Sequence, residues 1–292
     1  MVYSDSELIL RPDGSIYHLN LLPEHVAPIV FTVGDPERVG EVSKHFDKID
    51  IQRNHREFVT HVGTLKGQRI MVVSTGIGTD NIDIVMTELD ALVNIDFTTR
   101  TAKTELTPLS IIRIGTSGSI QEAIDVDSIV VSEMAVGLDN LMHFYDAPQQ
   151  AKEFDLADQL ADYLESKSED LVLMPYVFSA DKKLLQLFDK VQFAKGITVT
   201  SPGFYAPQGR ILRGSGTEPN LVKLLNGFKM KNGSLTNFEM ETAGIYGMAR
   251  LLGHQAVSIS TILANRITGR FSEKPQQSVE RMIEQVLNII IP

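Results

Sequence analysis

Short apolar runs alternate along the chain with segments whose apolar positions recur every three or four residues. Apolar or β-branched runs bounded by turn residues predict strands. Such runs occupy residues 28–33, 58–65, 70–74, 110–114, 128–135, 171–179 and 256–263. Because strands and helical segments alternate, the pattern predicts an α/β fold with a mixed central β-sheet flanked by helices.

Two segments have clear helical periodicity. Between residues 82 and 93, and again between 279 and 290, apolar side chains recur at i, i+3, i+4 and i+7. Residues 96–108, DFTTRTAKTELTP, are instead polar and rich in threonine, which predicts an exposed loop. No internal repeat, low-complexity tract or linker-like change of composition interrupts the chain, so we predict a single domain over residues 1–292.

Composition and charge narrow the classes of function. The formal net charge of −10 disfavours nucleic-acid and anionic-membrane partners, which require basic surfaces. No apolar run approaches the roughly 18 to 20 residues of a membrane helix, and the first residues lack the pattern of a signal peptide, so a cytoplasmic protein is expected. The chain has no cysteine, and its seven histidines lack metal-ligand spacing. We therefore predict neither thiolate chemistry nor a transition-metal site.

Glycine-containing loops follow three of the predicted strands. They are Gly34-Asp35-Pro36-Glu37-Arg38 (34–38), TGIGT (75–79) and RIGTSG (113–118). Ligands of open α/β sheets bind beyond the carboxyl ends of the strands. Each loop alone has an ordinary interpretation as a turn, a packing site or a structural ion pair. Together, two arginine-bearing loops in an acidic protein favour a site for a phosphate-sized anion, although the spacing fits neither a P-loop nor GxGxxG.

Two carboxylates flank a methionine in the segment Asn237-Phe238-Glu239-Met240-Glu241-Thr242. If Phe238 ends a strand and Thr242 begins a helix, both glutamates lie at the same corner as the glycine loops. Carboxylates there can accept hydrogen bonds from the hydroxyls of a sugar, and the methionine offers an apolar surface. A single glutamate in this place more often compensates the dipole of a helix start.

Seven sequence blocks together resemble the nucleoside phosphorylase superfamily, and within it the uridine phosphorylases. The blocks are VGDPERV (33–39), HREF (55–58), STGIG (74–78), RIGTSGSIQ (113–121), FYAPQGR (204–210), NFEMET (237–242) and ILANR (262–266). They occur in the order of the family and span most of the chain. The resemblance implies phosphorolysis, in which phosphate attacks the anomeric carbon of a nucleoside, the base leaves and ribose 1-phosphate forms.

The resemblance also implies a role for individual residues. The phosphate-binding set is Gly34, Arg38, Arg113 and Thr116, with Arg56 reaching in from a neighbouring subunit. The ribose-binding set is Glu239, Met240 and Glu241, with His18 of a neighbouring subunit at the 5′-hydroxyl. The base-binding set is Phe204, Gln208, Arg210 and Arg266. The residues implied in catalysis are Arg38, Arg113, Arg210 and Glu241, which stabilise charge that develops between a cationic sugar and an anionic base.

Inorganic phosphate is then a co-substrate, and no other cofactor or resident metal is implied. The amide of Gln208 and the guanidinium of Arg210 form the pyrimidine signature of the family, and Arg266 stands where purine-cleaving relatives carry an acid. Relatives form hexamers from dimers, so a homo-oligomer is implied. The chain departs from the family in two places: Pro207 replaces a glycine before Gln208, and segment 96–108 is long.

Several alternatives stay open at this stage. Deoxyuridine or thymidine could replace uridine as substrate, and a purine nucleoside phosphorylase is a further possibility on the same scaffold. A hydrolase would use water in place of phosphate, and a non-catalytic protein would bind a nucleoside without turning it over. Some relatives bind a monovalent cation. Glu57 matches one of its ligands, whereas Asn81 replaces a serine.

Overall fold

The computed structural model describes residues 1–168, 171–230 and 233–292, and it confirms the predicted α/β fold with a mixed sheet. The strands are β1 (Ile29–Val33), β2 (Lys48–His55), β3 (Phe58–Leu65), β4 (Gln68–Ser74), β5 (Ile95–Asp96), β6 (Thr101–Ala102), β7 (Ser110–Ser119), β8 (Ile129–Gly137), β9 (Tyr176–Ser179), β10 (Ala194–Thr200), β11 (Leu235–Glu239), β12 (Gln255–Asn265) and β13 (Arg270–Phe271).

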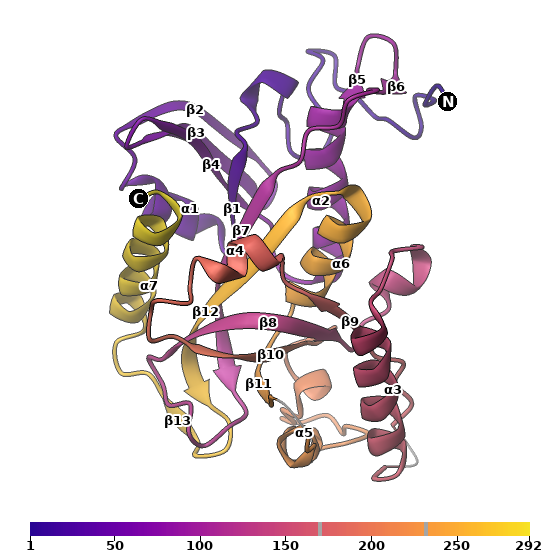
Figure 1. Cartoon of the computed structure of the whole chain (residues 1–292), viewed down its shortest axis with the longest axis vertical. Coiled ribbons are helices and arrows are strands. Elements are labelled where there is room, and N and C mark those ends of the chain that lie inside the picture. Colours follow the sequence, from indigo (N-terminus) through magenta and orange to yellow (C-terminus); the bar gives the residue numbers. More distant parts are fainter. Residues whose placement is uncertain (169–170, 231–232) are drawn as a thin grey trace.

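Helices flank this sheet. They are α1 (Pro36–Ser43), α2 (Thr79–Asn94), α3 (Ala151–Glu165), α4 (Lys182–Gln186), α5 (Leu221–Gly227), α6 (Thr242–Leu252) and α7 (Pro275–Ile290), with 3-10 turns η1 (Pro23–His25), η2 (Leu141–Phe144) and η3 (Ala206–Gln208). In Figure 1, α1 and α7 lie on one side of the strands, and α2 and α6 lie on the other. Both predicted helical segments are confirmed, as α2 and α7.

The sheet curls until part of it closes on itself. Its order is β13-β12-β8-β10-β11-β7-β1-β4-β3-β2, and β12 pairs with β7 as well as with β8. Five strands, β12, β8, β10, β11 and β7, thus form a closed circuit of hydrogen-bonded neighbours, as in a small barrel. β1, β4, β3 and β2 extend this circuit as an open sheet (Figure 1).

Burial explains which elements the hydrophobic pattern reveals. In β1 and β4 the last four or five residues are all buried, as expected for parallel strands covered on both faces. In α7 the residues Met282, Ile283, Val286 and Leu287 are buried along one stripe, and the helix contacts β7 and β12. Each such side chain contributes about 1.5 to 3 kcal/mol by leaving water. No helix in the described part of the chain is long and apolar enough to cross a membrane.

The predicted strand over residues 171–179 is wrong in its first half. Only Tyr176–Ser179 form a strand, β9, which pairs with β8. The preceding residues are apolar, but Val172 and Met174 are exposed. Pro175 lacks an N–H for a strand ladder, so the strand begins after it.

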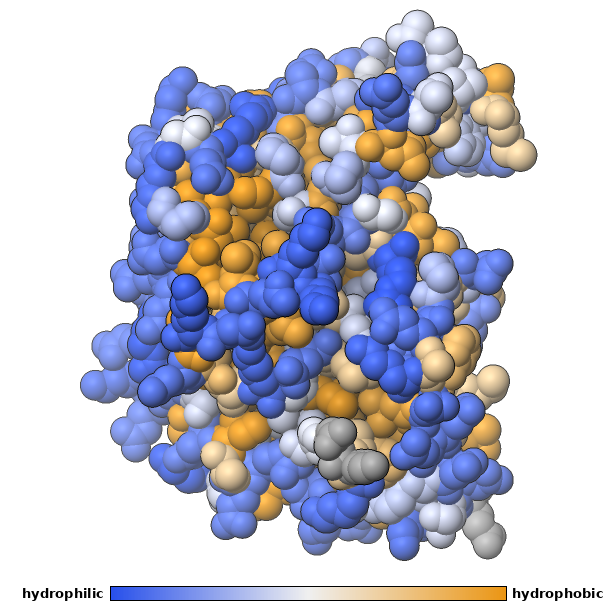
Figure 2. All heavy atoms as spheres, in the orientation of Figure 1, coloured by the Kyte–Doolittle hydropathy of each residue, from blue (hydrophilic) through white to orange (hydrophobic). Residues whose placement is uncertain are grey.

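The polar segment over residues 96–108 also differs from the predicted loop. It contains β6, which pairs with β5 in a small antiparallel hairpin, and a β-bridge joins Val2 to Thr101. Most of its other residues are exposed. Figure 2 shows hydrophilic side chains over much of the viewed face, with apolar patches between them. The part of the molecule that contains β5 and β6, at the upper right in Figures 1 and 2, projects from the body.

Candidate active site

A cavity of about 690 Å³ opens where β1, β4, β7 and β11 end. Ten of the residues singled out in the sequence line it: Gly34, Arg38, Arg113, Thr116, Phe204, Gln208, Arg210, Glu239, Met240 and Glu241. They come from four separate stretches of the chain. The predicted corner is confirmed, because β11 ends at Glu239 and α6 begins at Thr242.

Arg113 is the buried cation of this cavity. Its side chain is 6% exposed and lies on β7 among apolar neighbours. The guanidinium donates to the Glu241 carboxylate and lies 3.1 Å from Oε2 of Glu239. Burial by itself would lower the pKa of Arg113, but Glu239 and Glu241 outweigh it and raise the pKa above its usual value. Arg113 is therefore charged, and the protein's own carboxylates hold it.

Two glycines make this arrangement sterically possible. A Cβ at position 115 would overlap the Arg113 guanidinium, because residues 113 and 115 point to the same face of β7. Gly78 has φ +99°, a backbone conformation that side chains rarely adopt, and its N–H donates to Oε1 of Glu241 over 2.8 Å. In this structure the loop 75–79 therefore binds a side chain of the protein itself, the carboxyl group of Glu241.

The two glutamates have different surroundings. Glu239 accepts hydrogen bonds from the N–H groups of Glu241 and Thr242 and from the hydroxyl of Thr200. It thereby satisfies donors at the start of α6, which is the structural role considered above for a single glutamate. The carboxylate of Glu241 accepts only from Gly78 and Arg113 among the described residues. Burial raises its pKa, which Arg113 opposes and Glu239 reinforces.

Arg38 differs from Arg113 because no carboxylate in the described part of the chain forms an ion pair with it. It lies on α1, whose start is fixed by Pro36 and by the Asp35 carboxylate accepting from the Glu37 N–H. Within the described ranges its guanidinium has no hydrogen-bond partner, although it lines the cavity. Burial lowers the pKa of Arg38, and repulsion from Arg113 lowers it further. An anion in the cavity would relieve both costs.

The loop after β10 carries a second basic group. Arg210 donates to Oε1 of Gln208 over 2.5 Å and to the carbonyl of Phe204 over 2.8 Å, and its guanidinium lies 4.0 Å from the centre of the Phe204 ring. Burial, with repulsion from Arg266, lowers the pKa of Arg210 to about 10. This loop therefore presents an amide and a guanidinium side by side in the cavity.

Arg266 lies behind this loop. One guanidinium nitrogen donates to the carbonyl of Gln208 over 3.1 Å, and the other, Nη1, is buried without a partner among the described residues. Arg266 does not line the cavity, so it contacts Gln208 from outside the cavity.

His18 and Arg56 also lie outside this cavity. They form an exposed cluster with Tyr17: the Arg56 guanidinium lies 5.8 Å from the centre of the Tyr17 ring, and the rings of Tyr17 and His18 are 4.8 Å apart. One chain thus brings together ten of the thirteen predicted residues and leaves these two on a separate surface and Arg266 behind the loop.

The sequence did not reveal the apolar wall of the cavity. Phe238, Leu263 and Phe271 line it, from β11, β12 and β13. Phe238 and Leu263 belong to the blocks NFEMET and ILANR, where they resemble ordinary core residues. Phe271 lies at the end of a two-residue strand and is 64% exposed. A large apolar side chain at such an exposed position is the one feature that indicates a role in binding.

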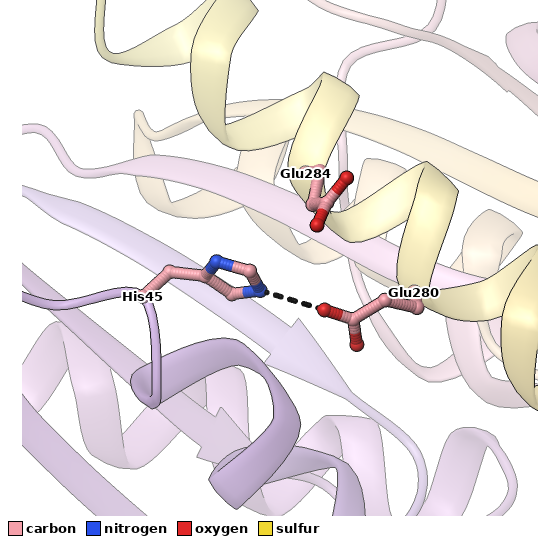
Figure 3. Close-up of side chains that lie close together, drawn as sticks. All are labelled: His45, Glu280 and Glu284. Carbon is pink, nitrogen blue, oxygen red and sulfur yellow. Dashed lines mark hydrogen bonds and ion pairs between the residues drawn. The ribbon is translucent and has the colours of Figure 1, made fainter.

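A second cluster of charged side chains lies away from the cavity. His45, which follows α1, and Glu280 and Glu284 on α7 place one ligand atom each within 4.8 Å of one another (Figure 3). Nε2 of His45 is 3.1 Å from Glu280, and the Lys44 ammonium is 2.6 Å from the other oxygen of Glu280. Because Lys44 already supplies a positive charge there, surface ion pairs account for this cluster.

The fold is that of a known class of enzyme. The family model described as the phosphorylase superfamily matches residues 28–291, and the chain belongs to this family. It is an enzyme of the nucleoside phosphorylase kind, a pentosyltransferase.

Individual relatives carry two kinds of name. The chain is 30% identical to uridine phosphorylase of Thermococcus kodakarensis over 278 residues, which is 95% of this chain and 87% of the relative. It is 25% identical to purine nucleoside phosphorylase DeoD-type 1 of Vibrio cholerae, over 94% and 95% of the two chains. A Trypanosoma brucei nucleoside phosphorylase, whose crystal structure is described as showing uridine phosphorylase activity, superposes with a TM-score of 0.88 at 28% identity, covering 98% and 99%.

Proposed function

We propose that the protein catalyses phosphorolysis of a pyrimidine nucleoside, converting uridine and phosphate to uracil and ribose 1-phosphate in nucleoside salvage or catabolism. The observation that carries this proposal is that one cavity is lined by the buried Arg113, the partly buried Arg38, an adjacent glutamate and the Gln208–Arg210 pair. In the reaction the bond from C1′ to N1 breaks, a phosphate oxygen bonds to C1′, and the departing base takes up a proton.

Phosphate is proposed to bind at Arg38 and Arg113, beside Gly34 and Thr116. Arg38 supports this most strongly, because it is a largely buried guanidinium that lacks a partner among the described residues. Arg38 supplies a positive charge that no described carboxylate pairs, and Arg113, although held by Glu239 and Glu241, lines the same cavity. Guanidinium groups bind phosphate oxygens in pairs of parallel hydrogen bonds, which would also orient the nucleophile.

The ribose is proposed to lie against Met240, with Glu241 accepting from its hydroxyls. The Glu241 carboxylate already accepts hydrogen bonds from the Gly78 N–H and from Arg113, so its oxygens act as acceptors. An oxocarbenium-like transition state carries positive charge on the sugar, and a nearby carboxylate and phosphate stabilise it. Glu239 is proposed to act beside Glu241, by fixing the start of α6 and the position of its neighbour.

The base is proposed to bind at Gln208 and Arg210, against Phe204. An amide offers one donor and one acceptor, which suits the edge of uracil, and a guanidinium stabilises negative charge on the departing base. Arg210 now donates to Gln208 and to a backbone carbonyl, and a uracil oxygen would replace one of these partners. Arg266 supports the loop through the Gln208 carbonyl.

Arg56 and His18 are proposed to serve the cavity of a neighbouring copy in a homo-oligomer. Their exposed cluster is consistent with such a role, since they do not reach the cavity of their own chain. In this assignment Arg56 meets the phosphate and His18 meets the 5′-hydroxyl of the sugar.

The proposal is tested by incubating the purified protein with uridine, thymidine and inosine, each with and without phosphate, and measuring release of the free base. We expect release from uridine only when phosphate is present. Release from inosine but not uridine would assign a purine substrate, as the name of the Vibrio cholerae relative would favour. Release from uridine without phosphate would identify a hydrolase.

A further inference from the structure

The N-terminal arm of the chain is attached to the polar segment 95–102. The guanidinium of Arg100 donates to three carbonyls of the arm, those of Tyr3 (2.9 Å), Ser4 (2.8 Å) and Leu8 (2.5 Å). A β-bridge joins Val2 to Thr101 beside it. The β5–β6 hairpin thus holds the first eight residues of an arm that continues to His18.

Further along, the arm is held by one carboxylate. Glu88 on α2 is buried, and it accepts from the N–H of His18 (3.0 Å) and the N–H of Leu19 (2.8 Å). The same carboxylate lies 2.7 Å from Nδ1 of the His18 ring. Glu88 is the only described residue that bonds both the backbone and the ring of His18, and its partner is 70 positions away in the sequence.

These bonds determine which ring nitrogen of His18 can accept a hydrogen bond. A backbone N–H only donates, so the oxygens of Glu88 are acceptors. Nδ1 must then carry the proton shared with Glu88. Nε2 of the neutral ring is left with a lone pair, and among the described residues it has no partner. The His18 side chain is 25% exposed, so part of the ring can be reached from outside the chain.

We infer that Glu88 is a positioning residue for substrate recognition: it holds His18 with Nε2 as the acceptor for a substrate hydroxyl, and Arg100 anchors the arm that delivers it. This inference rests on the proposed function, in which His18 meets the 5′-hydroxyl of the nucleoside. The ligand class it selects is a nucleoside with a free 5′-hydroxyl. The polar segment that interrupts the α/β pattern then has a role, since it fastens this arm.

The test compares uridine with 5′-deoxyuridine, which lacks the hydroxyl. Losing one such hydrogen bond should lower kcat/KM of Glu88→Gln for uridine by about 10-fold or more, and for 5′-deoxyuridine by less than about 2-fold. In a protein that already carries His18→Ala, adding Glu88→Gln should not lower kcat/KM for uridine any further. Glu165→Gln, at an exposed carboxylate on α3, is the matched control and should leave kcat/KM unchanged for both substrates. Equal loss on both substrates would mean that Glu88 only stabilises the fold, and would overturn the inference.

Two further measurements decide the question if Glu88→Gln does not fold. Arg100→Ala loosens the arm while leaving Glu88 and His18 intact, and it should give a smaller loss that is again confined to uridine. In the wild-type protein, ¹⁵N NMR of the histidine rings should show Nδ1 protonated and Nε2 unprotonated in neutral His18. A proton on Nε2 would overturn the inference. If the wild-type protein fails to cleave uridine at all, the proposed function fails, while the NMR result still reports on Glu88.

Discussion

Arg38 offers the sharpest test of the phosphate site, because the structure predicts opposite effects with and without the ligand. Its guanidinium is largely buried, has no described hydrogen-bond partner, and is repelled by Arg113. Replacing it by alanine should therefore leave the melting temperature of the phosphate-free protein unchanged or slightly higher. The same substitution should remove about half or more of the stabilisation that phosphate confers.

The magnitude follows from linkage. Phosphate at 100 times its Kd stabilises the folded state by about 2.7 kcal/mol. A chain of 292 residues unfolding as one unit has an unfolding entropy of about 0.6 kcal/mol/K, so the melting temperature rises by about 4 °C. Removing charge-assisted hydrogen bonds worth about 1.5 to 3 kcal/mol weakens binding roughly 10- to 150-fold. At the same phosphate concentration, the shift for Arg38→Ala then falls to about 0.5 to 2.3 °C.

The assay is differential scanning calorimetry across a phosphate titration, with sulfate-free buffer and constant ionic strength. Arg53→Ala is the matched control, because it removes one positive charge from an exposed position on β2. It should retain the full shift. An Arg38→Ala protein that keeps the wild-type shift would refute the phosphate assignment. A large drop in its phosphate-free melting temperature would show instead that Arg38 supports the fold.

Three further substitutions test other parts of the account. Arg210→Ala should lower kcat/KM for uridine by about 100-fold, as loss of an oxyanion-type donor does, while the phosphate-dependent melting shift stays at its wild-type value; parallel loss of both would contradict its assignment to the base. Glu241→Ala should abolish turnover and also cost about 3 kcal/mol of stability, because Arg113 loses one of its two buried partners; unfolding measured in urea checks this, and an unchanged stability would disprove the pairing. Glu153→Gln should make the melting temperature depend less strongly on pH in the acid range. Burial alone would raise the pKa of Glu153, but the bonds to Arg250 and to the Gln150 N–H prevail and place that pKa below its usual 4.5. The ionised carboxylate therefore stabilises the fold above that pH, and this stabilisation is lost as the pH falls through the lower pKa of the folded state. Melting temperatures between about pH 5 and pH 3 measure it, and identical slopes in the two proteins would count against it.

The hydrophobic pattern could predict the strands whose side chains are uniformly apolar, and it missed those that carry polar groups inward. β10 and β11 contain Thr198 and Asn237, which are fully buried. Thr198 bonds to Ser132 of β8 (2.5 Å) and to Asn237 (3.0 Å), and Asn237 bonds to Ser117 of β7 (3.0 Å). These groups satisfy one another inside the closed circuit of strands, so burial there leaves little apolar signal in the sequence.

The location of the candidate site was predictable, and its internal pairing was not. Residues near the ends of neighbouring strands converge at one edge of the sheet whatever their identity, which is why Gly34, Arg113 and Glu241 could be grouped from the sequence. The prediction that RIGTSG (113–118) forms a loop is wrong, because these residues belong to β7. That Arg113 meets Glu241, 128 positions later, depends on the exact packing of β7 against the start of α6. The same long-range packing places Glu88 against His18, and no local pattern marks either pair.

The most direct measurement is a crystal structure of the protein with phosphate and a non-reacting uridine analogue. The account predicts phosphate on the guanidinium groups of Arg38 and Arg113, the sugar hydroxyls on Glu241, and the uracil edge on Gln208 and Arg210, all within one cavity. Phosphate bound elsewhere, or a base turned away from Gln208 and Arg210, would contradict it.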